Sequence, residues 1–270
     1  MKLYANQIEE YIKCGYRYYL RNVIKVPNIY SLKVIIGKKF HNVIENDLEY
    51  FKKQNKYMKA EELVELWENL IFNELEDKEN NSNANDEIKF QAPDINEWNE
   101  IMETINGIIN QYVKIRMQSF FKPMLCQNEQ NINIDQDLIV AGKYDIIFKM
   151  GFAFFQIKKS IVKDYNPYNN LQLAINNLIL NEMFDSINTA YYIQLCPNNY
   201  NIISIIYKDY MIIKTKEIIL NTAKAIKNEI FLPCIRDTGY NCLYCQVNKH
   251  CKYLFEYENK EKGGEKSERI

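Results

Sequence analysis

The hydrophobic period of the sequence changes near residue 120, and this change restricts the fold more than any other feature. Before it, apolar residues recur with the spacing of amphipathic helices, so we expect helices at residues 6–21, 32–52, 59–79 and 95–119. After it, short runs rich in β-branched and aromatic residues predict strands at 124–134, 138–150 and 152–160. The remaining pattern predicts a helix at 169–184, strands at 189–197 and 200–207, and a helix at 208–229.

This order of elements predicts one α/β or α+β core that carries an all-helical insertion. The core would form a single domain over residues 1–255, with the insertion at about 50–120 and a disordered charged tail at 256–270. The polar stretch NNSNANDE at 80–87 has no apolar anchor, so we expect it to form a loop within the insertion.

Charge and composition limit the classes of function. The chain has 270 residues and a formal net charge of −1, so its overall charge does not indicate nucleic-acid binding. Residues 13–25, KCGYRYYLRNVIK, interleave basic and aromatic side chains. This pattern is typical either of a nucleic-acid contact or of an ordinary amphipathic helix with a solvated basic face. The sequence shows no membrane span and no signal peptide, so the expected location is cytoplasmic.

The cysteine pattern predicts a metal centre near the C-terminus. In a reducing compartment the seven cysteines are expected to be metal ligands or core residues rather than disulfides. Cys242, Cys245 and Cys251 form a C-x2-C-x5-C array, which suits three ligands of one centre. A fourth ligand would come from one of three residues: Cys14, Cys234 or His250. The spacing does not distinguish a zinc knuckle from an iron–sulfur cluster. Two cysteines within apolar strands are expected in the core: Cys126 and Cys196.

Five polar side chains on neighbouring predicted elements suggest a divalent-cation site. Gln156 and Lys158 lie two residues apart on a strand, so they project from the same face. Asp145 lies within an apolar strand, where a buried carboxylate is costly unless it is paired or binds a cation. His41 and Gln172 add an imidazole and an amide from two helices. Such a set suits a hard cation that activates water against a phosphodiester, with a lysine to neutralise the developing charge.

Five short motifs follow one another along the chain: IEEYIKCGYRYYLR, GKKFHNVIE, GKYD, QIK and LQL. The C-x2-C-x5-C array comes after them, and together they extend over residues 8–254. This ordered set resembles the RecB-like branch of the PD-(D/E)XK nuclease superfamily. The pattern is most similar to the iron–sulfur members of that branch, such as the AddB nuclease domain and the CRISPR-associated Cas exonucleases.

The resemblance implies a restriction-endonuclease-like fold, in which a central mixed sheet is flanked by helices. It implies that Mg²⁺ or Mn²⁺ is held by four groups: His41, Asp145, Gln156 and the backbone carbonyl of Ile157. Catalysis would involve Lys158, Asp145, Gln156 and Gln172. A 4Fe–4S cluster, with Zn²⁺ as the alternative, would join the N- and C-terminal regions through Cys14, Cys242, Cys245 and Cys251. Nucleic acid would contact Arg17, Tyr18 and Arg21.

The implied function is a metal-dependent DNA exonuclease that acts on single strands or duplex ends, in DNA repair and recombination or in CRISPR adaptation. Its implied partners are DNA and either a helicase or CRISPR adaptation proteins. The chain departs from the pattern where Gln156 replaces the usual Asp or Glu, and where Asn176 replaces a frequent tyrosine. Because an amide carries no negative charge, metal affinity should fall unless Glu45 or Glu129 compensates. The alternatives are an inactive nucleic-acid-binding subunit that keeps the fold and cluster, and a zinc-stabilised helical adaptor.

Overall fold

The computed structural model of the chain describes residues 1–26, 32–81, 94–118, 123–126, 129–148, 151–184, 187–234, 242 and 245–253. The chain divides into two compact units. Unit 1 contains Met1–Ala5 and Ser31–Glu217, and unit 2 contains Asn6–Tyr30 and Ile218–Ile270. The expected tail at 256–270, and the expected loop beyond residue 81, lie outside the described residues.

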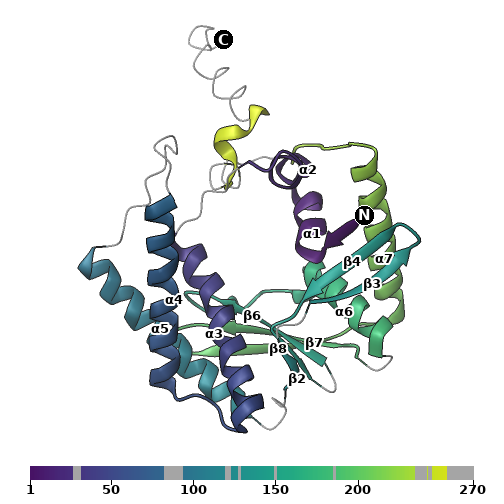
Figure 1. The fold of residues 1–270 in the computed structure, drawn as a ribbon. Helices are drawn as coiled ribbons and strands as arrows, with labels where there is room; N and C mark the ends of the chain where they lie inside the picture. Colours follow the sequence, from purple (N-terminus) through teal and green to yellow (C-terminus); the bar gives the residue numbers. More distant parts are fainter. Residues whose placement is uncertain are drawn as a thin grey trace, which may run out of the picture. The chain divides into compact units, whose positions relative to one another are not determined.

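Three long helices form one layer of unit 1 (Figure 1): α3 (Leu32–Gln54), α4 (Ala60–Asn81) and α5 (Ile95–Arg116). Each begins and ends within three residues of a helix that the hydrophobic period predicts. The helices share one buried core with the sheet, where the ring of Phe40 contacts those of Trp67, Tyr112 and Phe155. The segment expected as a helical insertion therefore supplies part of the core that supports the sheet.

Two sheets lie in unit 1. The larger has the order β2-β5-β6-β7-β8 and consists of β2 (Pro123–Cys126), β5 (Ile146–Phe148), β6 (Gly151–Ile157), β7 (Thr189–Leu195) and β8 (Tyr200–Ile206). Strands β6 and β7 are parallel, and the other neighbouring pairs are antiparallel. The smaller sheet has the order β1-β4-β3, from β1 (Lys2–Tyr4), β4 (Leu138–Lys143) and β3 (Glu129–Asp135). This is the α/β architecture with mixed sheets that we expected.

The single strand predicted at residues 138–150 is wrong, because the structure has two strands in different sheets. Strand β4 ends at Lys143 and β5 begins at Ile146, which leaves Tyr144 and Asp145 between the sheets. The Tyr144 hydroxyl donates to the backbone carbonyl of Asn176 at 2.7 Å, and Asp145 accepts from the backbone of β6. These tertiary bonds replace the strand pairing that the apolar run suggested. The predicted strand at 124–134 likewise divides into β2 and β3.

Helix α6 (Leu171–Phe184) covers the face of β6 and β7 opposite to helices α3–α5. Alternate residues of the two strands belong to two different clusters, as the period of two requires. Phe155 and Ile193 pack into the α3–α5 core, whereas Phe152 and Tyr192 pack with Leu173 of α6. Helix α7 (Asp209–Lys227) follows β8 and passes from unit 1 into unit 2.

Unit 2 contains a helix that breaks where the sequence predicted continuity. In place of one helix at 6–21, the structure has α1 (Ala5–Lys13), α2 (Gly15–Tyr18) and a π-helical turn at Tyr19–Val23. Cys14 between them is extended, and its Sγ accepts the backbone N–H of Arg17 at 3.4 Å. A Cβ at Gly15 would lie 3.0 Å from the backbone of Leu232, which also accepts the N–H of Tyr16. The close approach of the 231–232 segment explains the break.

Within the described helices, none is long and apolar enough to cross a membrane.

Candidate functional site

The structure pairs two of the predicted ligands, His41 and Asp145. Nδ1 of His41, on α3, lies 2.7 Å from Oδ1 of Asp145, and Oδ2 of Asp145 accepts the backbone N–H of Phe155 at 2.9 Å. Asp145 is 8% exposed, so its carboxylate is nearly buried between these partners. The Asp145 charge and hydrogen bond raise the pKa of His41, and burial opposes that increase. The pair thus joins helix α3 to strand β6 at the point where the two sheets separate.

The backbone of β6 adds an oxygen at the same edge. Successive residues of a strand direct their backbone groups to alternate edges, so Phe155 and Ile157 face one edge together. The N–H of Phe155 marks this edge because it bonds to Asp145, while the N–H of Lys158 donates to Leu195 of β7 on the other edge. The carbonyl of Ile157 therefore faces the edge that carries Asp145. Imidazole nitrogen, carboxylate oxygen and a backbone carbonyl suit Mn²⁺ or Mg²⁺, with water completing the coordination.

Gln156 follows Phe152 and Phe154 in the alternation along β6, so it projects from the face that α6 covers, and Lys158 follows the end of the strand at Ile157. Oε1 of Gln156 accepts a hydrogen bond from the hydroxyl of Tyr192, a β7 residue that the sequence analysis had not included. Lys158 lies close enough to Cys196 for its charge to lower the pKa of that thiol, although burial has the larger effect and raises it. Gln172 lies half-buried in the first turn of α6. Cys196 is 1% exposed, which confirms its predicted place in the core, whereas the side chain of Cys126 is outside the described structure.

Of the two carboxylates considered as compensation for the Gln156 amide, one is engaged elsewhere. Glu129 forms an ion pair with Lys2 at 2.6 Å. Glu45 lies one helical turn after His41, on the same side of α3. Burial and the nearby Glu49 raise its pKa, and Lys143 opposes the increase. Glu45 is therefore the better placed of the two.

In unit 2, Cys234 lies with two of the predicted cluster ligands. Its thiol neighbours those of Cys14 and Cys242, and burial together with these two neighbours raises its pKa to about 12. From the sequence, Cys234 was one of three candidates for the fourth ligand, and the family resemblance implied Cys14 in its place. The backbone N–H of Cys245 donates to the carbonyl of Cys242 at 3.1 Å, which closes the turn of the array. Within the described part of the chain, no group of three or more His, Cys, Asp or Glu is arranged to hold a metal ion.

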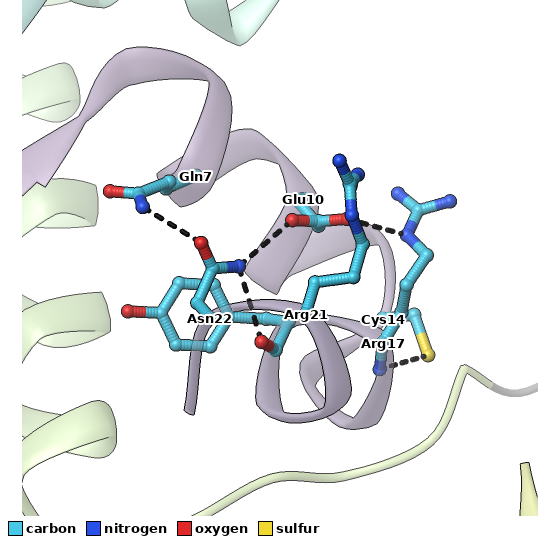
Figure 2. A network of polar contacts seen from close by, with 7 residues as sticks. Gln7, Glu10, Cys14, Arg17, Arg21 and Asn22 are labelled. Carbon is cyan, nitrogen blue, oxygen red and sulfur yellow. Dashed lines mark hydrogen bonds and ion pairs between the residues drawn. The ribbon is translucent and has the colours of Figure 1, made fainter. Parts of the chain in front are cut away.

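A buried carboxylate organises the basic segment of unit 2, as Figure 2 shows. Oε1 of Glu10 lies 3.1 Å from Nε of Arg17 and 2.7 Å from a terminal nitrogen of Arg21, and Glu10 is 8% exposed. Asn22 donates to the other carboxylate oxygen at 3.1 Å. Two guanidinium groups share one carboxylate, so a positive charge is left over, and the arginine side chains are 29% exposed. Such a fixed pair suits an anionic phosphate.

The structure corrects the expectation for Tyr18. Its side chain is 5% exposed and packs against Tyr11 and Phe231, so it is not available to a nucleic acid. Two other tyrosines lie nearer the surface: Tyr16 stacks on Tyr19 with ring centroids 5.8 Å apart.

Further aromatic and basic groups adjoin Tyr16. The ring of Tyr253 lies edge-on at 4.8 Å, and the ammonium of Lys252 lies 5.6 Å from the Tyr16 centroid. Tyr253 is 39% exposed. We call Tyr16, Tyr19, Lys252 and Tyr253 the tyrosine cluster. Exposed rings beside cations are typical of surfaces on which unpaired bases stack.

Comparison with known protein families identifies the superfamily of the chain. The family model of the PD-(D/E)XK nuclease superfamily matches residues 3–252. The chain belongs to the PD-(D/E)XK nuclease superfamily. Nucleases of this superfamily typically use divalent metal ions such as Mg²⁺.

One solved structure shows the same fold at low sequence identity. A protein from Eubacterium rectale, described as a putative exonuclease, matches with a TM-score of 0.53 and 11% identity, over 100% of this chain and 90% of that chain. The structure of SSO0001 is less similar, with a TM-score of 0.37 and 11% identity over 92% of this chain and 93% of that chain. No curated protein matches the sequence.

Proposed function

We propose that this nuclease is a divalent-metal-dependent DNA exonuclease that acts on single strands or duplex ends. One observation carries the proposal. The buried carboxylate of Asp145 bonds both to His41 and to the β6 edge on which the Ile157 carbonyl lies. These groups, with the Gln156 amide oxygen, would hold Mg²⁺ or Mn²⁺. When bound, the cation supplies a water of lowered pKa and polarises the phosphodiester.

The residues around this site have separate tasks in the proposal. Lys158, which directly follows β6, orients the attacking water and neutralises charge that develops on the phosphate. Gln172, in the first turn of α6, positions the substrate backbone or the lysine. Asp145 and the β6 backbone fix the orientation of His41, because a bound imidazole needs its ring held by the surrounding structure.

The cysteines of unit 2 are proposed to hold a 4Fe–4S cluster through Cys14, Cys242, Cys245 and Cys251, with Zn²⁺ as the alternative metal. Its support is the contact of Cys234 with Cys14 and Cys242, which gathers thiols from the first helical segment and the C-terminal region. Anaerobically purified protein should be brown and should contain iron and acid-labile sulfide. Zinc without iron would select the alternative. Protein that contains neither iron nor zinc would refute the proposed metal centre.

The DNA surface is proposed to include the guanidinium pair of Arg17 and Arg21 and the tyrosine cluster. Replacing Arg17 with alanine should weaken binding of a labelled single strand in EDTA, and should reduce the steepness of its salt dependence because one phosphate contact is lost. Exposed Lys249 provides a matched control. Equal effects of the two alanine variants would show that the pair is not a specific contact.

Nuclease activity itself is tested with a labelled single strand and a duplex with free ends. We expect Mn²⁺-dependent degradation that Lys158→Ala and Asp145→Asn reduce by at least about 100-fold, the range of a lost catalytic group. Lys159→Ala is the control, since Lys159 is the exposed neighbour of Lys158. Degradation that persists in both site variants, or that persists in EDTA, would contradict the proposed mechanism. Digestion of a closed circular single strand would contradict exonuclease action.

One observation favours a second candidate, a binding subunit of low or absent nuclease activity. Gln156 carries no charge, and its carbonyl already accepts from Tyr192. Under this alternative the protein binds DNA but does not cleave it, and serves a helicase or a CRISPR adaptation complex. Gln156→Glu separates the two, since restoring the carboxylate should raise Mg²⁺-supported cleavage if the remaining site is intact. An unchanged or lower rate would mean that the site has adapted to the amide or is not catalytic.

A further inference from the structure

The amide of Gln156 creates a requirement that a carboxylate would not have. The two ends of a carboxylate are both oxygen atoms, so either orientation can bind a cation. An amide has one oxygen, which accepts, and one NH₂ group, which only donates and would repel a cation. A metal site that uses glutamine therefore needs another residue that fixes the orientation of the amide, so that its oxygen faces the cation.

The structure provides a chain of contacts that ends on this amide. The hydroxyl of Tyr192 donates to Oε1 of Gln156. The ring of Tyr192 stacks on that of Tyr165, with centroids 4.4 Å apart and planes inclined by 17°. Burial raises the pKa of Tyr192, and the charge of Tyr165 adds to the increase. Tyr192 therefore remains a neutral phenol that can donate.

The far end of the chain is fixed by the start of helix α6. Nδ2 of Asn170 donates to the hydroxyl oxygen of Tyr165 at 3.1 Å. Oδ1 of Asn170 accepts the backbone N–H of Leu173, also at 3.1 Å. Asn170 thus uses both ends of its side chain, and it stands two residues before Gln172.

Asn170 fixes Tyr165, and Tyr165 supports Tyr192 through its ring. A backbone N–H only donates, so Leu173 fixes the oxygen end of Asn170 as the acceptor. The NH₂ end of Asn170 then donates to Tyr165, whose ring stacks on that of Tyr192. The single proton of the Tyr192 hydroxyl goes to Gln156.

We propose that Tyr192 is a positioning residue of the metal site, which fixes the carbonyl oxygen of Gln156 as its metal-facing atom and is itself held by its stack on Tyr165. A carbonyl oxygen has two lone pairs, so one accepts from Tyr192 and the second is left for Mg²⁺ or Mn²⁺. Tyr192 thus gives the amide the fixed metal-facing oxygen that a carboxylate has in either orientation. The inference rests on the proposed function, because it assumes the cation site beside Asp145.

The test is a double-mutant cycle in which Mn²⁺ affinity is measured without DNA. The electron paramagnetic resonance signal of free Mn²⁺ reports how much of the ion is bound. Tyr192→Phe keeps the stacked ring and removes the hydroxyl, so the amide is free to turn. We expect about 10-fold weaker Mn²⁺ affinity, the lower end of the range for lost groups that orient a ligand. In a Gln156→Glu background the same change should alter affinity by less than about twofold, because either carboxylate oxygen can bind.

Two further variants keep the proposal open to refutation. Tyr165→Leu removes the ring that stacks on Tyr192 and should weaken Mn²⁺ binding in the same direction. If Tyr192→Phe binds Mn²⁺ like the wild type, or weakens binding equally in both backgrounds, the positioning role is refuted. Asp145→Asn tests the underlying site separately. Wild-type protein that binds no Mn²⁺, or that binds it equally after Asp145→Asn, would refute the metal site and the role of Tyr192 together.

Discussion

Replacing Asp47 with alanine should destabilise unit 1 by about 3–5 kcal/mol, the usual cost of removing one partner of a buried ion pair. Oδ2 of Asp47, on α3, lies 2.5 Å from a terminal nitrogen of Arg116 on α5 and accepts from the Tyr112 hydroxyl at 2.9 Å. Oδ1 accepts the backbone N–H of Met58 at 2.9 Å. The side chain of Asp47 is fully buried, and that of Arg116 is 4% exposed.

The magnitude follows from what the substitution leaves behind. Without Asp47 the guanidinium of Arg116 keeps one bond, to the carbonyl of Met58 at 2.5 Å, and is left as a buried charge without its carboxylate. Tyr112 and the Met58 N–H also lose their acceptor. For a unit of this size, a loss of about 3–5 kcal/mol lowers the melting temperature by about 6–20 °C.

Urea denaturation and calorimetry of the intact chain measure the effect. The control is Glu49→Ala, since Glu49 is 54% exposed and its change should stay within about 0.5 kcal/mol. Combining Asp47→Ala with Arg116→Met should recover much of the loss, because removing both charges leaves no unpaired ion. An Asp47→Ala cost below about 1 kcal/mol, or no recovery in the double variant, would refute the argument that this ion pair joins α3 to α5.

Two other predictions concern packing and pH. Gly107→Ala on α5 should be destabilising although alanine favours helices, because its Cβ would lie 2.5 Å from the carbonyl oxygen of Pro197. Gly37→Ala on α3 should instead stabilise by about 1 kcal/mol, because a Cβ there has nothing within 4 Å. Urea denaturation measures both changes. Equal effects would show that α5 does not pack closely on the loop after β7. In metal-free protein, the charge of Asp145 raises the pKa of His41 in the folded state. The ion pair therefore stabilises the fold fully below about pH 6.5, the pKa of an unfolded histidine. This stabilisation is lost as the pH rises through the pKa of His41 in the folded state. Urea denaturation in EDTA should show this decline in wild type and not in Asp145→Asn, and identical slopes would contradict it.

Much of the helical layer was predictable because its signals are local. Helices α3, α4 and α5 follow the apolar period closely, and α5 begins at a capping box that the sequence displays. The Asp94 side chain accepts the backbone N–H of Glu97, whose side chain accepts that of Asp94. Period and capping depend on residues within one or two turns, so neither needs the rest of the fold.

Elsewhere distant contacts overruled the local pattern. The apolar run at 138–150 reads as one strand, yet Asp145 bonds to Phe155 and divides it. Cys14 interrupts a helix of good period because the 231–232 backbone packs against Gly15. In both places the deciding partner lies on another element, ten residues away for Asp145 and near the other end of the chain for Gly15, so the local hydrophobic period does not show it.

The candidate site shows the same division. The sequence by itself predicted a site made of His41, Asp145, Gln156 and Lys158, because motif spacing and the cost of a polar group in an apolar strand are properties of the sequence. Only the tertiary structure paired His41 with Asp145 at 2.7 Å. It also gave Gln156 a hydrogen-bonding partner in Tyr192. In the sequence, Tyr192 is a tyrosine within an apolar strand and cannot be distinguished from an ordinary core residue. A hydrogen bond depends on where atoms lie after folding, and residues 36 positions apart acquire that relation only when β6 pairs with β7.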